Sequence, residues 1–478
     1  MGPFQTVNRH QWPGAETIET RLGYFEFKGG YPTATAAAKL SDHLVFNRAV
    51  EAYLAHMPTV SWFRVWKGTA DAGGRATHQM VIRENRLDAA TLLVAGHIEN
   101  VYGLAAIDLK RDGPVVVEVP PGMLGGMTDM RQEEVCAIGP AGIDKGQGGM
   151  FLVTPPNYEG PPPDGYITVK SGTYGVLFGV RGFLVEGRRD DAVAQMELMK
   201  STRIYPLSKV GDPPSTTFVN GSGTELDTML PDSYDFFEDL AQIVERETSV
   251  LLAPHERSQL ASIGILHNRP FEPDAVRRSL LGEAVKVGSA MARASAFAST
   301  DPNRLAYPDR RWEWLSIGGC GWDANGSANT DSRAALGYAA IGMSPAMVLK
   351  IAGGGSQYFW TPRDVNGAFL DGGRSYRLHL PANVPVKNSW SVVVYDAQSR
   401  SMLRSSQRFP SISQNTGPEV NADGSVDIVF DPRAPRGKAR NWIQTVEGRG
   451  WFPLLRFYGP LQPLLDRTWK PGDVEMIV

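Results

Sequence analysis

The sequence predicts a mainly β protein of the α+β multidomain class, in which a helical insert separates two antiparallel modules of β-sandwich or jelly-roll type. Three observations support this class. Short β-rich runs alternate with Gly- and Pro-rich turns over residues 78–187. Apolar segments punctuated by Gly, Asn, Asp and Pro follow one another from residue 369 to the C-terminus. Between them, apolar residues recur at helical spacing over residues 232–248 and 273–297.

The chain is long for a single hydrophobic core, because it has 478 residues. We therefore expect two to four domains. The expected division is a helical segment at 1–77, a β module at 78–200, a linker with the helical insert at 201–345, and a β-sandwich at 346–478.

Composition and charge exclude several classes of partner. The net charge of −3 leaves no basic excess to neutralise phosphates, so nucleic acid is not an expected partner. No stretch approaches the ~20 consecutive apolar residues of a membrane helix, so we expect no membrane span. The N-terminus, MGPFQTVNRHQWPG, lacks the basic and apolar regions of a signal peptide. The expected location is the cytoplasm, or the periplasm or exterior if a leader has been removed.

The first helix is predicted over residues 34–57, where apolar residues recur at three- and four-residue spacings. Pro58 is expected to end it, because the residue before a proline is biased away from the helical conformation. The β-rich runs then begin, among them VYGLAAIDL, PVVVEVP and GMFLVTP. A short helix is expected at 189–200, and the polar, turn-rich stretch 201–225 is typical of a linker.

The helical insert contains the longest predicted helix, residues 273–297, with Pro273 near its start. One face of this helix is expected to be apolar, and it comprises Val276, Leu280, Leu281, Ala284, Val287 and Ala290. A further helix is predicted at 331–343, before the C-terminal strands begin.

Several longer phrases resemble a known bacterial family. HIENVYGLAAIDLKRDGPVVVEVP and GGMFLVTPPNYEGPPPDGYITVKS resemble domain of unknown function 1254. SWSVVVYDAQSRSML and NWIQTVEGRGWFPLLRFYGP resemble the C-terminal domain of unknown function 1214 of the same family. The resemblance implies two largely β modules with a helical insert, and it implies no established reaction.

This chain departs from the family pattern at one place. The family usually has Asn-x-Asp-Thr-x-Tyr before its first long strand, whereas Asn100 and Tyr102 here are separated by Val101 alone. The Asp and Thr of the pattern are missing, so any role that depends on them is in doubt for this chain.

Familiar catalytic and metal-binding motifs are missing from the sequence. There is no G-x-S-x-G motif, and Lys145 of the loop GPAGIDKGQGG is not followed by the Ser or Thr of a P-loop. The eight histidines lack metal-ligand spacing, and Cys136 and Cys320 form either two free thiols or one disulfide. We therefore predict no metal and no cofactor.

The predicted helix 331–343 carries two charged residues among Ala, Leu and Gly. Asp331 could act as a catalytic group or serve with Asn329 as an N-terminal cap. Arg333 has apolar neighbours, so it needs either a carboxylate in a structural ion pair or an anionic ligand. Tyr338 lies on the same helix and is a candidate ligand contact.

Aromatic residues of the C-terminal module allow two interpretations. Tyr358, Trp360 and Trp442 could form part of a sandwich core, which is the commoner role of such residues. They could also line a cleft for a sugar or an aromatic ring.

Asp129 follows a glycine-rich turn and is the remaining candidate acid or base. It could lie in an exposed loop, or it could pair with Asp331 or Glu99 across a module boundary, as general acid–base catalysis requires. The first hypothesis is a hydrolase for small molecules or glycans, with Asp129, Asp331 and Arg333 as catalytic residues. Its cleft between the modules would bind ligand through Asn100, Tyr102, Tyr338, Tyr358, Trp360 and Trp442.

Two other hypotheses stay open. The same cleft could belong to a non-catalytic protein that binds a carbohydrate or another small molecule. Alternatively, the sandwich surface could serve a structural or assembly role. A homo-oligomer is compatible with the sequence, although no feature of the sequence argues for one.

Overall fold

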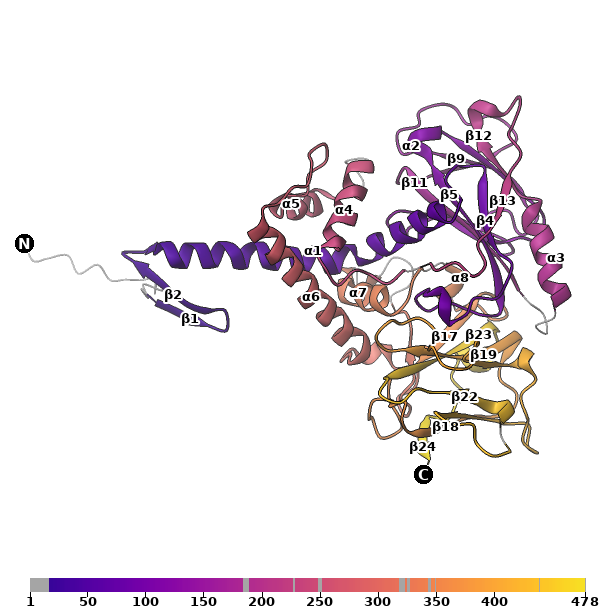
Figure 1. The fold of residues 1–478 in the computed structure, drawn as a ribbon. Helices are drawn as coiled ribbons and strands as arrows, with labels where there is room; N and C mark the ends of the chain where they lie inside the picture. The colour runs from indigo at the N-terminus through magenta and orange to yellow at the C-terminus, as the bar shows by residue number, and fades with distance from the viewer. Residues whose placement is uncertain are drawn as a thin grey trace, which may run out of the picture.

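The computed structural model describes residues 17–183, 189–226, 228–247, 252–317, 323–324, 327–342, 345–348, 350–437 and 439–477. Two β modules and a group of helices make up the body, and a long helix reaches out from it (Figure 1). The predicted class, an α+β multidomain protein with mainly antiparallel sheets, is confirmed.

The N-terminal module is built from two sheets that enclose one core. The six-stranded sheet has the order β13 (Thr217–Asn220), β4 (Gln79–Arg83), β5 (Asn100–Asp108), β11 (Gly175–Phe183), β7 (Leu124–Asp129) and β8 (Glu134–Ile138). The four-stranded sheet has the order β10 (Ile167–Lys170), β9 (Gly149–Thr154), β6 (Val115–Val119) and β12 (Arg203–Pro206). Alternate residues point inward, so Val115 and Val117 of one sheet meet Ile107 and Phe178 of the other.

The C-terminal module repeats this two-sheet plan. The five-stranded sheet has the order β14 (Glu313–Trp314), β17 (Ser356–Trp360), β23 (Trp451–Pro460), β19 (Val386–Asp396) and β20 (Ser411–Ser413). The four-stranded sheet has the order β22 (Trp442–Gln444), β21 (Val426–Asp431), β18 (Ser375–Leu380) and β24 (Val474–Ile477). Phe359, Val392 and Ile428 belong to the core between the two sheets.

Helices cover part of the outer face of the five-stranded sheet. The helices described are α1 (Ala34–Asp71), α2 (Leu109–Asp112), α3 (Arg189–Lys200), α4 (Asp235–Arg246), α5 (Pro254–Ser262), α6 (Ala275–Phe297), α7 (Thr330–Ala339), α8 (Pro345–Val348) and α9 (Gln462–Leu465). Tyr53 of α1 and Ala335 of α7 share a core with Trp360 and Leu454 of the sheet. Both faces of this sheet are therefore buried over much of its area.

The first helix continues well beyond its predicted end, because α1 contains Pro58 and runs on to Asp71. A proline inside a helix costs ~3 kcal/mol, since one hydrogen bond is lost and its ring crowds the preceding turn. Val60, Phe63 and Val65 lie beyond the proline and are all buried, and this burial offsets the cost. The prediction that Pro58 ends the helix is wrong because tertiary packing outweighs the local preference.

The stretch 201–225, predicted to be a linker, instead contributes strands to the N-terminal module. β12 pairs antiparallel with β6, and β13 pairs parallel with β4. Polar and turn-forming residues between these short edge strands give the stretch its linker-like composition. The chain therefore leaves the N-terminal module after β13.

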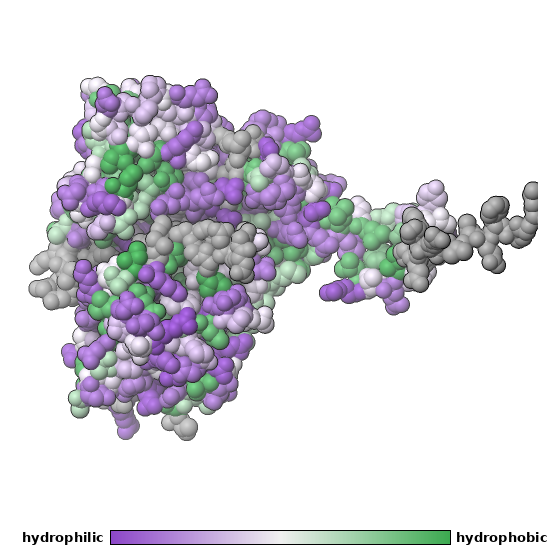
Figure 2. Space-filling view, turned by 180° about the vertical axis from the view of Figure 1, so that it is seen from behind, coloured by the Kyte–Doolittle hydropathy of each residue, from purple (hydrophilic) through white to green (hydrophobic). Residues whose placement is uncertain are grey.

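The N-terminal part of the chain extends away from the body (Figure 1). A small sheet of β1 (Thr17–Thr20), β2 (Gly23–Lys28) and β3 (Tyr31–Pro32) packs on the first turns of α1. We call residues 17–48 the arm. Its apolar side chains Tyr24, Tyr31 and Leu44 are exposed, and hydrophobic residues gather there in Figure 2. Within the described ranges, no helix is both long and apolar enough to cross a membrane.

The crossing of α1 and α6 depends on one glycine. A Cβ atom built on Gly288 would lie 2.6 Å from Cδ1 of Tyr53, whereas one on Gly282 of the same helix meets only Tyr234 Cβ at 4.0 Å. Gly288→Ala should therefore lower the free energy of unfolding by about 1–2 kcal/mol, because the tyrosine ring has to move. Denaturant titration measures this change.

Gly282→Ala is the matched control. It should raise the free energy of unfolding by about 0.5–1 kcal/mol, since alanine is the better helix former and has room there. Equal effects of the two substitutions would show that the packing of α6 on α1 is not as tight as described.

Candidate functional site

The most polar buried region of the protein lies where the two β modules meet. Residues 94–100 of the N-terminal module pass across the outer face of the five-stranded sheet of the C-terminal module. The amide of Ala95 donates to the carbonyl of Arg400 at 2.8 Å, which ties the two modules together. We call this contact the seam.

The sheet presents polar residues to the seam because of its register. Tyr358, Arg456, Ser391 and Ser413 are successive cross-strand neighbours on β17, β23, β19 and β20. Cross-strand neighbours point to the same face of a sheet, so these four side chains form one row. Ser356 and Tyr458 are paired in an adjacent row. A polar surface of this kind needs polar partners from whatever covers it.

The covering segment supplies those partners from its backbone and side chains. Arg456 donates from Nη2 to the carbonyl of Ala95 at 2.7 Å, and Tyr395 donates to the carbonyl of Gly96 at 2.6 Å. The Tyr458 hydroxyl is hydrogen-bonded to Nε2 of His97. The backbone therefore accepts bonds from the sheet at consecutive residues. Ala95 adopts a φ of 49°, a strained value for a residue with a side chain, so this arrangement costs free energy.

The histidine of the seam is neutral. The amide of Glu99 donates to Nδ1 of His97 at 3.3 Å, so that nitrogen is an acceptor and the ring proton lies on Nε2. Burial lowers the pKa of His97 well below its ordinary value, and the charges of Arg456 and Arg181 lower it further. The ring therefore stays uncharged at neutral pH.

The charges of the seam are carried by Arg456 and Glu99. Burial opposes the charge of Arg456, yet the hydroxyls of Tyr395, Tyr458 and Tyr358 keep the pKa of the guanidinium above its ordinary value. Burial raises the pKa of the Glu99 carboxyl, against a hydrogen bond with the Ser413 side chain and nearby arginine charges. Glu99 therefore holds its proton to a higher pH than an exposed glutamate does.

Four buried polar atoms of the seam have no hydrogen-bond partner within the part of the chain that the structure describes. They are Glu99 Oε2, Asn100 Oδ1, Ser391 Oγ and Arg456 Nε. Buried polar atoms are nearly always paired, so four together in one contact point to partners from outside the chain, either water or a ligand. Both donors and acceptors are among the four.

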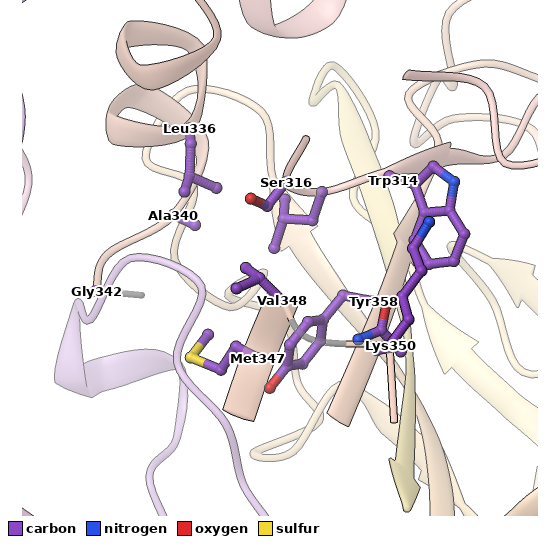
Figure 3. Close-up of a pocket in the computed structure, with 11 residues that line it drawn as sticks. Trp314, Ser316, Leu336, Ala340, Gly342, Met347, Val348, Lys350 and Tyr358 are labelled. Carbon is purple, nitrogen blue, oxygen red and sulfur yellow. The ribbon is translucent and has the colours of Figure 1, made fainter. Parts of the chain in front are cut away.

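A cavity of about 40 Å³ lies beside the seam (Figure 3). Leu336 from α7 and Met347 and Val348 from α8 form apolar parts of its wall. Gln357 and Tyr358 of β17 add polar groups. One water needs ~10–15 Å³ on this measure, so the cavity accommodates a group of a few heavy atoms.

Tyr358 belongs to both the cavity and the seam. Its side chain lines the cavity, and its hydroxyl is hydrogen-bonded to Ser356 Oγ at 2.6 Å. The guanidinium of Arg456 lies 5.4 Å from the centroid of its ring. A molecule in the cavity would therefore contact a side chain that the seam holds in place.

Three of the predicted ligand-binding residues meet at this place. Asn100 donates to the Tyr102 hydroxyl at 3.4 Å beneath the seam, and Tyr358 faces them from the C-terminal module. Asn100 lies here because it is both the last residue of the covering segment and the first residue of β5.

Asp129 is buried rather than exposed, so the exposed-loop interpretation is wrong. Its Oδ1 accepts from the amides of Arg131 and Glu133 at 2.8 and 3.0 Å, which closes the turn after β7. Burial raises the pKa of this carboxyl to about 6. A pKa near neutrality suits a general acid or base, but the hydrogen bonds of this carboxylate are those that close a turn.

Arg333 lies close to Asp129 and joins a network of charges. Its Nη2 donates to the carbonyl of Arg131 at 3.1 Å, and Arg131 is paired with Glu133 and Glu256. Burial lowers the pKa of Arg333, followed by the charge of Arg131. Asp331 is exposed in the first turn of α7, where Asn329 is the N-cap and accepts from the Ser332 amide at 2.9 Å. Catalytic roles for Asp129, Asp331 and Arg333 stay predictions.

Two of the other predicted contacts, Tyr338 and Trp360, lie in core positions, whereas Trp442 is half-buried. Tyr338 accepts from Arg293 Nε at 2.8 Å and packs under Arg400. Trp360 is fully buried beside Phe297. Trp442 lies in the other sheet and donates to the carbonyl of Asp431 at 2.8 Å. The core interpretation therefore describes Trp360, whereas Trp442 lies half-buried in the edge strand β22.

Sequence reasoning missed Arg456 and His97, and it named Glu99 only as a possible partner of Asp129. Arg456 is the one charged residue of the strand WFPLLRFYGP, and that isolated charge was a usable signal. His97 and Glu99 lie close to Asn100 in the sequence, but nothing local indicates that a strand more than 350 residues away covers them. Among the described residues, no group of three His, Cys, Asp or Glu could hold a metal. Cys136 is a buried free thiol, and Cys320 lies outside the described residues.

Similarity to one solved structure supports the fold. The alignment with the crystal structure of the VPA0106 protein from Vibrio parahaemolyticus covers 91% of this chain and 100% of the VPA0106 chain. The two share 18% sequence identity, with a TM-score of 0.56. An uncharacterised protein from Burkholderia cenocepacia covers 93% of this chain and 97% of its own, at 12% identity and a TM-score of 0.39. The sequence matches none of the curated proteins.

Family comparison agrees with the two-module division. Residues 77–206 match a family described as protein of unknown function (DUF1254). Residues 355–462 match one described as protein of unknown function (DUF1214). The two matches cover the N-terminal and C-terminal β modules, whose contact is the seam. The resemblance of the N-terminal module to DUF1254 and of the C-terminal module to DUF1214 is therefore confirmed.

Proposed function

We propose that this protein binds a small molecule in the cavity beside the seam. The observation that carries the proposal is the double role of Tyr358, which lines the cavity and is hydrogen-bonded to Ser356 of the polar sheet face. Ligand sites commonly lie between domains and combine apolar walls with a few oriented polar groups. The cavity has both kinds of wall, and it lies where α7, α8 and the five-stranded sheet come together.

The unpaired polar atoms of the seam support the same conclusion. Arg456 Nε can donate, whereas Asn100 Oδ1 can only accept. Water or a polar ligand group reaching the seam past Tyr358 would satisfy both. Such partners also explain why a sheet face that could have been apolar carries Ser, Tyr and Arg side chains.

Hydrolysis of a small molecule or glycan is a second candidate function, and Glu99 favours it. A buried carboxyl with a raised pKa and one unbonded oxygen is suited to act as a general acid. The neutral His97 beside it could accept or relay a proton. In this alternative Glu99, rather than Asp129, is the acid.

A homo-oligomer stays a prediction. Its natural place would be the arm, because Tyr24, Tyr31 and Leu44 are exposed there. Light scattering on the full chain and on a chain lacking residues 1–33 would test this placement.

Removing the Tyr358 hydroxyl tests the binding proposal. Tyr358→Phe should lower the free energy of unfolding by about 0.5–1.5 kcal/mol, through loss of the bond to Ser356. It should also weaken binding of any small molecule that a ligand-observed NMR screen finds for the wild type, because the ring that lines the cavity is no longer held.

Tyr395→Phe is the matched control for that variant. Tyr395 bonds within the seam but does not line the cavity, so its loss should reduce stability and leave the affinity unchanged. If both variants bind like the wild type, the cavity is not the binding site.

Glu99→Gln tests the second candidate through the dependence of stability on pH. The pKa of Glu99 is raised in the folded state, so folding retains a proton that the unfolded chain releases. Stability should fall as the pH rises from the unfolded pKa of about 4.5 through the folded value, and Glu99→Gln should remove that part of the fall.

The exposed Glu197 provides the control, since Glu197→Gln should leave the pH profile unchanged. Urea unfolding from pH 4 to pH 9 measures both variants. If Glu99→Gln keeps the wild-type profile and full hydrolytic activity on a substrate found by screening, Glu99 is not the acid.

A further inference from the structure

We infer that the ligand of the cavity is a small organic carboxylate with a short apolar or aromatic chain, and that Lys350 is its counter-ion. This inference rests on the proposed function and specifies its chemistry.

The charge of the lining has one sign. Among the described residues that line the cavity, Lys350 is the single charged one, and none carries a carboxylate. Its Nζ forms no hydrogen bond or ion pair with any described residue, and it lies 4.1 Å from the ring centroid of Trp314. A lysine that lacks a carboxylate and lies at a cavity is available to an anion from outside.

The surroundings of Lys350 strengthen its preference for an anion. Lys350 is exposed to solvent at its place in the lining, so a ligand can reach it. Partial burial lowers the pKa of its ammonium, and the charge of Arg467 nearby lowers it further. A bound carboxylate would relieve both effects, because it stabilises the charged form of the lysine.

The rest of the lining selects for carbon rather than for an inorganic anion. Leu336, Met347 and Val348 form an apolar wall away from Lys350 (Figure 3). A phosphate or sulfate would leave this wall without a partner, whereas a chain of a few carbons would cover it. Trp314, whose ring lies under the Lys350 ammonium, adds an aromatic side chain to the lining next to the lysine.

The polar groups of β17 are compatible with a ligand whose carboxylate lies at Lys350. Gln357 and Tyr358 line the cavity together, so a carboxylate paired with Lys350 has further groups of the chain within the same space. The volume of about 40 Å³ limits the enclosed part of the ligand to a few heavy atoms. Butyrate and benzoate therefore represent the two shapes that the inference allows.

Titration of the full-length protein with matched acids and amides tests the inference. Isothermal calorimetry and ligand-observed NMR at pH 7 would compare butyrate with butyramide and benzoate with benzamide, with glucose as a neutral polyol. At least one acid should bind at least about tenfold more tightly than its amide, since a charged hydrogen bond is lost in the amide.

Three variants assign that preference to a residue. Lys350→Met should reduce the affinity for the acid about tenfold or more, while Lys350→Arg should keep it within a few-fold of the wild type. Lys209→Met, an exposed lysine of the N-terminal module, should change nothing. The wild-type affinity should fall as the pH is raised toward the pKa of Lys350, and the Lys350→Arg variant should lack this fall.

The outcomes separate this inference from the proposed function. If amides bind as tightly as acids, or if glucose alone binds, the carboxylate inference fails and small-molecule binding stands. If the acids bind equally well to Lys350→Met, Lys350 is not the counter-ion and the inference also fails. If none of these compounds binds and a wider screen finds no ligand lost in Tyr358→Phe, both the inference and the proposed function fail.

Discussion

The buried charge of Arg456 on the face of a β-sheet constrains what can pack against that face. A guanidinium removed from water must be surrounded by hydrogen-bond acceptors, because an unpaired buried charge costs several kcal/mol. The carbonyls of Ala95 and Gly96 and the hydroxyl of Tyr395 meet part of this need. The backbone of residues 94–100 therefore has to follow the sheet closely, and the position of the N-terminal module follows from that path.

The same sheet face is apolar toward one end of its strands and polar toward the other. The apolar part is covered by helices, and the polar part contacts the N-terminal module. Toward Trp360 and Leu454 the face is apolar and is covered by α1, α6 and α7. Toward Ser356 and Tyr458 it is polar and meets the seam. Tyr358 lies between the two regions, beside the cavity. A space bordered by both a helical layer and another module is harder to fill completely than one between two regular sheets, which is a physical reason for a cavity there.

Local patterns predicted the elements well and their partners poorly. The sequence indicated the β modules and the helix 273–297, and it named Asn100, Tyr102 and Tyr358, which the structure brings together. It placed Val276 and Ala290 on the buried face of α6, although both are exposed, because the helix turns Leu281, Val285 and Gly288 toward α1. Periodicity specifies that a helix has an apolar face, but the crossing with another helix decides which residues of that face are buried.

The site was only partly predictable for a related reason. Asn100 was named from the family-like pattern and Tyr358 as one of several aromatic residues, whereas the pairing of His97 with Tyr458 depends on the final positions of both modules. Each module alone would expose a polar surface that needs no partner, since water would satisfy it. Only the joined modules remove that water and leave Glu99, Asn100 and Arg456 short of partners. The chemical character of the site is thus a property of the contact between the domains, so a change that loosens this contact would also release Tyr358 from the position in which it lines the cavity.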